Sequence, residues 1–236
     1  MPLRSSKPMR RFLTLCICLL PALSQAHDLW IERAGTRLTL AYGHAGGGHA
    51  GERHLDYAPG SVQSALCVDA DGATVSTTFT GYPATLEADC AAAWFQMANH
   101  WSKTPYGTKN LPKAEAGAVL DSWLAVESVK RIDAWGEALT RPLTASLELV
   151  PLRDPLHLKV GDKLRVAVYR DGRPLSGVTV AYFDQPRGVT EADGALNIRV
   201  RKPGLQLIQA SIETPLDDGQ ADRRIDAAAL QFEIAP

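Results

Sequence analysis

The sequence predicts a mainly β protein, built as two β-sandwich modules of immunoglobulin or transthyretin type with a helical insertion in the first module. Nineteen glycines and fifteen prolines are spread along the 236 residues, which favours many turns over a helical bundle. The second half of the chain alternates apolar and polar residues between turn signals such as Asp171-Gly172 and Asp193-Gly194. The net charge of −1 gives no basis for nucleic-acid binding.

Residues 1–26 have the three parts of a secretory signal peptide. A basic segment precedes an apolar run at residues 12–23, and small residues lead to a cleavage site after Ala26. This run is too short to cross a bilayer and no longer apolar run follows, so the chain is not expected to span a membrane. We therefore expect export to the periplasm and a mature protein that begins at His27.

The first module is expected over residues 27–153. Short strands lead into a glycine-rich loop at residues 42–53, which is unsuited to regular structure. A hairpin over residues 64–79 and a core strand at residues 94–97 follow. Residues 113–139 combine many alanines with an apolar spacing near 3.6, which predicts one or two short helices packed as an insertion across the sheet.

The second module is expected over residues 154–236, as an immunoglobulin-like β-sandwich. Its alternating runs predict strands at residues 164–169, 178–183, 196–200, 205–212 and 230–234.

Two cysteines remain after removal of the signal peptide, Cys67 and Cys90. An even pair of cysteines in an oxidising compartment favours a disulfide over a thiol metal site. The bridge would close a loop of roughly 20 residues.

Four of the six histidines lie within residues 27–54, three of them in the stretch YGHAGGGHAGERH at residues 42–54. Imidazole is a common ligand of zinc, copper, nickel and cobalt, and the glycines would let several rings approach one ion. If cleavage leaves His27 first, its α-amino group and its imidazole can chelate one ion together. The alternative is a solvated loop whose histidines bind nothing. The candidate metal ligands are His27, His44, His49 and His54, with His100 either a fifth ligand or a packed histidine.

No recognisable enzyme motif accompanies these histidines. The sequence has no HExxH, GxSxG or P-loop motif, so we expect a binding protein and not an enzyme. Two alternatives stay open. One is a histidine-brace copper enzyme acting on polysaccharide, which also needs an N-terminal histidine and a β-sandwich. The other is a structural or adhesion module without a ligand.

Four stretches carry a family resemblance: HDLWIE at residues 27–32, GHAGGGHAGERH at 43–54, WSKTPYGTKNLPK at 101–113, and residues 161–211. They resemble a bacterial periplasmic family of domains of unknown function, linked to nickel and cobalt uptake as accessory proteins of energy-coupling-factor type transporters. The resemblance implies a soluble periplasmic protein that captures nickel or cobalt or hands it to a membrane transporter, with His27 and His44 as ligands. Copper and zinc are also compatible with nitrogen donors of this kind.

Overall fold

The fold is that of a computed structural model of the chain, which describes residues 27–45 and 54–235. Strands dominate, and the described residues contain two short 3-10 helices, η1 (Lys113–Glu115) and η2 (Glu137–Thr140). The strands are β1 (Asp28–Ala34), β2 (Arg37–Gly43), β3 (Val62–Val68), β4 (Thr78–Gly81), β5 (Ala84–Glu87), β6 (Ala92–Thr104), β7 (Gly107–Lys109), β8 (Asp121–Ile132), β9 (Glu148–Pro151), β10 (Lys163–Arg170), β11 (Arg173–Pro174), β12 (Thr179–Tyr182), β13 (Gln185–Val189), β14 (Ala195–Arg199), β15 (Gly204–Pro215) and β16 (Arg223–Ile234).

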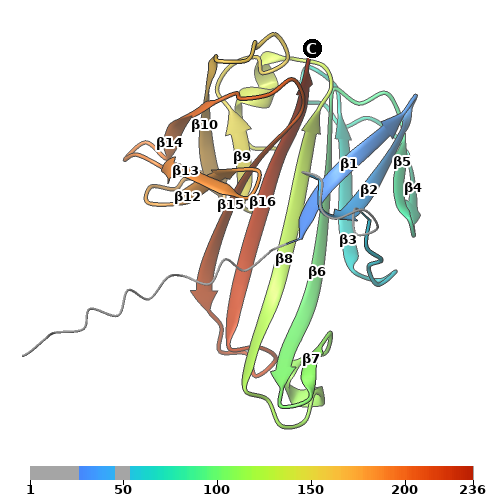
Figure 1. Ribbon diagram of the computed structural model, residues 1–236. Helices are drawn as coiled ribbons and strands as arrows, with labels where there is room; N and C mark the ends of the chain where they lie inside the picture. The colour runs from blue at the N-terminus through green and yellow to red at the C-terminus, as the bar shows by residue number, and fades with distance from the viewer. Residues whose placement is uncertain (1–26, 46–53, 236) are drawn as a thin grey trace, which may run out of the picture.

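A long central sheet runs the height of the molecule (Figure 1). Its strand order is β13-β12-β15-β16-β8-β6-β3, with β7 beside the far end of β6. The neighbours pair antiparallel except β16 and β8, which are parallel. Because β16 and β8 come from opposite sides of residue 153, strands of both expected modules share this sheet.

Two smaller sheets cover opposite faces of the central sheet. One has the order β1-β2-β5-β4, and the other contains β9, β10, β11 and β14. An apolar cluster that includes Leu38, Phe95 and Val129 fills the first interface, and a second cluster that includes Leu164 and Phe232 fills the other. The mainly β prediction is therefore confirmed, although the two apolar layers share one sheet and do not form separate modules.

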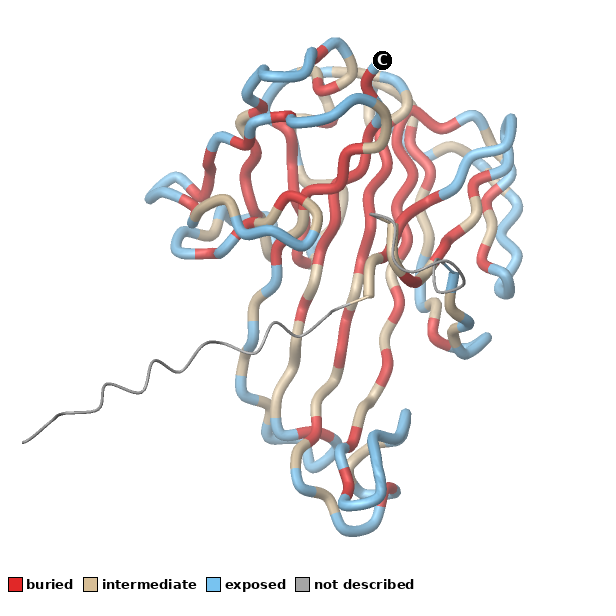
Figure 2. The backbone as a smooth tube through the Cα atoms, viewed as in Figure 1, coloured by how far each residue is buried: buried red, intermediate tan, exposed pale blue. Residues whose placement is uncertain are grey.

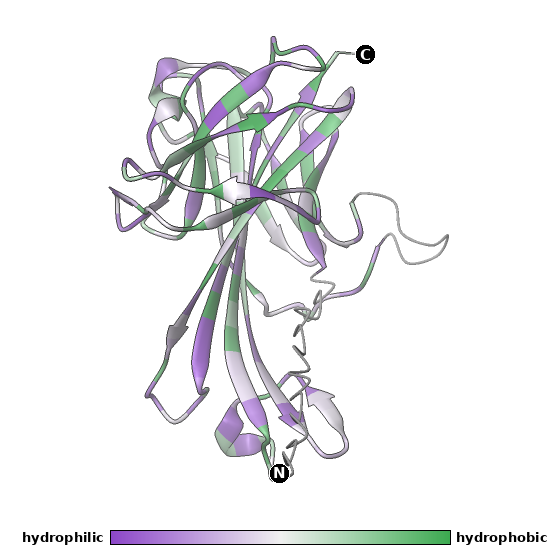
Figure 3. Cartoon of the chain, turned by 60° about the vertical axis from the view of Figure 1, so that its left-hand side comes forward, coloured by the Kyte–Doolittle hydropathy of each residue, from purple (hydrophilic) through white to green (hydrophobic). Residues whose placement is uncertain are grey.

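The central sheet continues beyond both covering sheets. We call this part, residues 98–104, 121–126, 211–215 and 223–227, the extension. Figure 2 shows that fully buried positions gather in the upper, three-layered part, whereas the extension alternates buried, intermediate and exposed residues. Figure 3 shows it from the side as a narrow sheet that carries both polar and apolar residues. Among the described residues, no helix has the length and apolarity to cross a membrane.

The helical insertion predicted for residues 113–139 is wrong. Residues 121–132 form β8, in the middle of the central sheet, and only the 3-10 helices η1 and η2 flank it. Apolar clusters cover both faces of β8, with Val129 in one cluster and Ile132 in the other. A strand covered on both faces loses the simple alternation of apolar and polar residues, so its apolar positions can imitate a helical period.

The predictions of the Asp171-Gly172 turn and of the disulfide are confirmed. Asp171 and Gly172 both have positive φ, 53° and 70°, as a two-residue hairpin turn requires. Cys67 and Cys90 form a disulfide, buried beneath the first covering sheet. The hairpin predicted for residues 64–79 forms only next to its turn, where Val68 pairs with Thr74, because β3 joins the central sheet while β4 pairs with β5 in the covering sheet.

Candidate functional site

The hairpin of β1 and β2 brings His27 and His44 together. Its turn consists of two residues, and Gly35 there has a φ of +65°, a conformation that favours glycine. This turn sets a register in which Asp28 pairs with Gly43. His27 and His44 are the next residues outward on the two strands, and their ring centroids are 5.2 Å apart. Two candidate ligands thus meet at the open end of the hairpin.

The carboxylate of Asp28 holds this open end in place. Its Oδ2 accepts a hydrogen bond from the backbone N–H of Ala45 at 2.9 Å, which fixes the chain directly after His44. Its Oδ1 accepts a hydrogen bond from Nε2 of Gln209 on β15 at 2.8 Å. Asp28 therefore links both histidine-bearing segments to the central sheet.

The Tyr42 hydroxyl lies 2.9 Å from Nδ1 of His27, and the two ring centroids are 5.0 Å apart. Burial, with a smaller contribution from the negative charge of Glu127, raises the pKa of Tyr42 to about 12. Tyr42 is thus a neutral phenol at physiological pH and orients one ring nitrogen of His27 through a hydrogen bond.

Glu127, on β8, completes the surroundings of the histidine pair. Val129, two residues away on the same face of β8, belongs to the apolar cluster beneath β1 and β2, so Glu127 faces the same side. Glu127 is largely buried, and desolvation raises the pKa of its carboxyl to about 7. We call the whole group the rim, because it borders that apolar cluster where the extension begins. The rim consists of His27, Asp28, Tyr42, His44, Glu127 and Gln209.

The His54 side chain lies apart from the histidine pair, although the His54 backbone forms a β-bridge with Gly43, next to His44. Its Nε2 lies 2.9 Å from Oε1 of Glu32, and its ring packs against Trp30 at 5.3 Å between centroids. Trp30 and Glu32 alternate with the core-facing Leu29 and Ile31 along β1, so His54 lies on the other face of the hairpin.

The remaining histidines are also apart from the pair or outside the described residues. His49 belongs to residues 46–53, which lie outside the described part of the chain. Successive side chains of β6 point to opposite faces of the central sheet, and His100 is an odd number of residues from both Phe95 and Met97. His100 therefore lies on the face of the sheet opposite to the rim. The structure therefore brings together His27 and His44 and separates both from His54 and His100.

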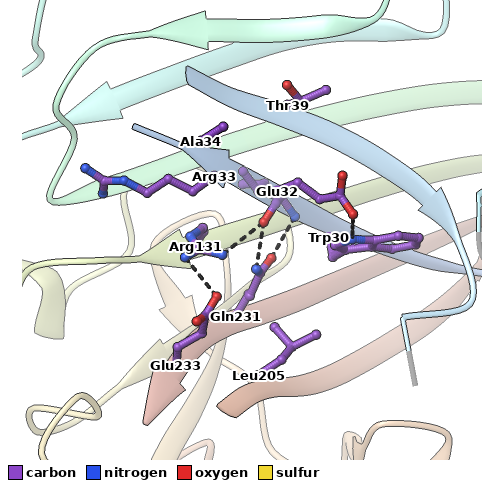
Figure 4. Close-up of a pocket in the computed structure, with 10 residues that line it drawn as sticks. Trp30, Glu32, Arg33, Ala34, Thr39, Arg131, Leu205, Gln231 and Glu233 are labelled. Atoms are coloured by element: carbon purple, nitrogen blue, oxygen red, sulfur yellow. Dashed lines mark hydrogen bonds and ion pairs between the residues drawn. The ribbon is translucent and has the colours of Figure 1, made fainter. Parts of the chain in front are cut away.

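A shallow pocket of about 510 Å³ lies beside the hairpin, between β1 and the ends of β8, β15 and β16 (Figure 4). Its polar groups are already paired. The Gln231 side-chain amide exchanges two hydrogen bonds, of 2.7 and 2.8 Å, with the backbone of Ile31. Arg131 donates to the Ile31 carbonyl and pairs with Glu233 at 3.0 Å. These contacts fasten β1 to the central sheet, and the histidine pair lies outside this pocket.

Among the described residues, no three side chains of histidine, cysteine, aspartate or glutamate are grouped closely enough to enclose a metal ion. His27 and His44 supply two ring donors. If the chain is cleaved after Ala26, as the sequence predicts, the α-amino group of His27 would add a third nitrogen. Sequence reasoning found both histidines but missed Tyr42, Glu127 and Gln209 as their surroundings. His27 and His44 lie at equal distances along the sequence from the Gly35-Thr36 turn, so a two-residue hairpin there could have predicted that they pair and that Tyr42 lies beside them. No local pattern points to Glu127.

Comparison with known proteins gives one match. The family described as domain of unknown function (DUF4198) matches residues 24–214, most of the chain. No curated protein and no solved structure matches it.

Proposed function

The chain belongs to the DUF4198 family, whose description assigns no activity, and from the rim we propose that it captures a divalent transition-metal ion, with nickel or cobalt as the first candidates. The juxtaposition of His27 and His44, 5.2 Å apart between ring centroids, carries this proposal. The resemblance of HDLWIE and GHAGGGHAGERH to a family linked to nickel and cobalt uptake supports the choice of metals.

The proposed ligands are nitrogen donors. After cleavage at Ala26, the α-amine and the imidazole of His27 would chelate one ion, and His44 would add a second ring. Binding through Nδ1 of His27 would exchange its hydrogen bond with Tyr42 for a bond to the ion. His49, which follows His44 by five residues, remains a proposed further ligand. Copper(II) and zinc would also bind such donors, so metal availability would decide occupancy.

The proposed setting is the periplasm, where the exported protein would act without catalysis. It would bind the ion in solution and deliver it to a membrane transporter. Removal of the leader during export would complete the site. While the leader is attached, the α-nitrogen of His27 is part of an amide and has no free lone pair for coordination.

The test is isothermal titration of protein that begins at His27 with Ni²⁺, Co²⁺, Cu²⁺ and Zn²⁺. A version with one additional residue before His27 removes the free amine beside the ring. We expect stoichiometric Ni²⁺ binding, an affinity at least about 10-fold lower in the extended version, and a similar loss for His44→Ala. His54→Ala is the matched control, because His54 lies on the other face of the hairpin.

The outcomes separate the alternatives. Equal metal affinity of the native and extended versions would show that the α-amine is not a ligand. A loss of affinity caused by His54→Ala but not by His44→Ala would show that the pair of His27 and His44 is not the binding site. Absence of binding by every version would favour a structural or adhesion module.

One observation favours a second candidate, the histidine-brace copper enzyme. Trp101 and Trp123 pair directly across β6 and β8, on the face of the extension that continues from the rim. Both are partly exposed, and the Arg223 guanidinium lies 5.4 Å from the Trp123 ring centre. Aromatic rings on a flat sheet are suited to stacking against a sugar. Copper-dependent oxidation of a polysaccharide, lost with His44→Ala, would establish this alternative; its absence would leave metal capture.

A further inference from the structure

Glu127 differs from the fully buried acidic side chains among the described residues. Glu148 on β9 pairs with Lys130, and Asp226 on β16 pairs with Arg224 and Arg170. Glu127 makes no hydrogen bond and no ion pair with any residue in the described ranges 27–45 and 54–235. An ionised carboxylate withdrawn from water without a cation is costly, so the Glu127 carboxyl either keeps a proton or is balanced by a cation outside the described residues.

The position of Glu127 indicates where that cation belongs. Along β8, Glu127 is the first residue of its face beyond the apolar cluster that contains Val129. Along β2, Tyr42 occupies the equivalent place beyond Leu40, and it is within electrostatic range of Glu127. The Tyr42 hydroxyl contacts Nδ1 of His27. Glu127 therefore faces the end of the hairpin that carries His27 and His44.

The neighbours of Glu127 on the central sheet leave its charge unbalanced. Directly opposite it are Met97 on β6 and Ala227 on β16, and the position beyond Ala227 is Ser211 on β15. None of these side chains is charged. Facing it from the hairpin are Tyr42, a neutral phenol, and the two histidines. A positive charge in this region would thus come from the mature N-terminus, from a residue outside the described ranges such as Arg53, or from a bound ion.

We propose that Glu127 supplies the negative charge that balances a cation bound by His27 and His44, and that it thereby makes the rim select doubly charged over singly charged metal ions. This inference rests on the proposed function. Glu127 acts through space and is a positioning and selectivity residue, since the donor atoms that hold the ion are nitrogens. The ligand class is a divalent transition-metal ion, as opposed to a soft monovalent ion such as Cu⁺ or Ag⁺.

Coulomb's law makes the effect of Glu127→Gln depend on the charge of the ion. For a separation of about 10 Å and an effective dielectric constant of about 40, removing one negative charge lowers the binding affinity for a monovalent ion about fourfold and that for a divalent ion about 15-fold. The loss for the divalent ion is the square of the loss for the monovalent ion. A purely structural role of Glu127 would lower both affinities by the same factor.

The experiment titrates protein that begins at His27 with Ni²⁺ and with Ag⁺, in chloride-free buffer at pH 8, where Glu127 is ionised. Wild type, Glu127→Gln and Glu213→Gln are compared, with circular dichroism to verify folding. Glu213 lies on the same face of the sheet at an exposed position and pairs with Arg223, so its variant controls for net charge alone. We expect Glu127→Gln to bind Ni²⁺ with an affinity about 15-fold lower than the wild type and Ag⁺ with an affinity about fourfold lower. Glu213→Gln should lower the affinity for either ion less than about twofold.

The result that overturns the inference is wild-type Ni²⁺ binding that His44→Ala weakens but Glu127→Gln leaves unchanged, or equal losses for Ni²⁺ and Ag⁺. In that case metal capture stands and the role of Glu127 does not. Absence of Ni²⁺ binding by the wild type overturns the proposed function and the inference together.

Discussion

Lys130 and Glu148 form an ion pair in the interior of the protein, with 2.6 Å between Nζ and Oε1 and only 1% of each side chain exposed. Glu148 also accepts hydrogen bonds from the backbone N–H groups of Leu143 and Thr144 and from the Thr144 hydroxyl. The pair connects β8 with β9 and with the segment before β9. It is the reason that a lysine can occupy the middle of a buried strand.

Lys130→Met should destabilise the protein by about 3–5 kcal/mol, because it leaves the Glu148 charge buried without its cation. Urea unfolding followed by circular dichroism measures the change. The double variant Lys130→Met/Glu148→Gln should recover part of this loss, since no buried charge remains. A single variant within about 1 kcal/mol of the wild type would contradict the prediction.

Glu127 should make stability depend on pH. Burial raises the pKa of its carboxyl from 4.5 to about 7, so between these values the folded protein keeps a proton that the unfolded chain releases. Stability therefore falls as pH rises from about 4.5 to about 7 and is constant above. With allowance for the partial exposure of Glu127, the loss should be about 2 kcal/mol.

Glu127→Gln removes this dependence. In the presence of a chelator, the variant should match the wild type at pH 4.5 and exceed its unfolding free energy by about 2 kcal/mol at pH 8. A stability difference between Glu127→Gln and wild type that is independent of pH would show that Glu127 is not desolvated as described.

Loss of the disulfide should destabilise the first covering sheet. Cys67 and Cys90 are 23 residues apart, and a bridge closing a loop of this length contributes about 3 kcal/mol through the entropy of the unfolded chain. Cys67→Ala/Cys90→Ala should lose about this amount in denaturant unfolding, and reduction of the wild type should lower its stability similarly. Equal stability of oxidised and reduced wild-type protein would argue against the bridge.

Asp28→Ala should weaken metal binding although Asp28 is not a proposed ligand. The change removes the hydrogen bonds to Ala45 and Gln209 that hold the segment after His44 against the central sheet. Supporting contacts of this kind typically change metal affinity about 10-fold to 100-fold, and Ni²⁺ titration should show a loss in this range. Gln209→Ala, which removes one of the two bonds, should lose less. An Asp28→Ala protein with wild-type affinity would show that the hairpin alone positions His44.

Local patterns in the sequence were sufficient for several features. Asp171-Gly172 predicted a turn because few residue pairs accept two consecutive positive φ angles, and the structure has that turn. Cys67 and Cys90 predicted a disulfide because they form an even pair after an export signal, and the structure has that bridge. The concentration of large apolar residues at residues 94–97 predicted a core strand, which lies within β6.

The helical prediction for residues 113–139 failed for a non-local reason. β8 pairs with β6 on one side and, in parallel, with β16 about 100 residues later on the other. Both of its faces are covered, so its apolar residues do not mark one side only. The buried Lys130 is accepted because Glu148 on β9, the next strand along the chain but part of a different sheet, pairs with it.

The sequence by itself determined the turns, the cysteine pair, the mainly β class and the set of candidate histidines, His27, His44, His49 and His54, because these depend on residue type and on neighbours along the chain. Only the tertiary structure decided that His54 lies on the other face of the hairpin, that β8 is a strand, and that Glu127 lies within electrostatic range of Tyr42, which contacts His27. These depend on which strands become neighbours in a sheet. That selection comes from burying surfaces far apart in sequence, which no local window of residues contains.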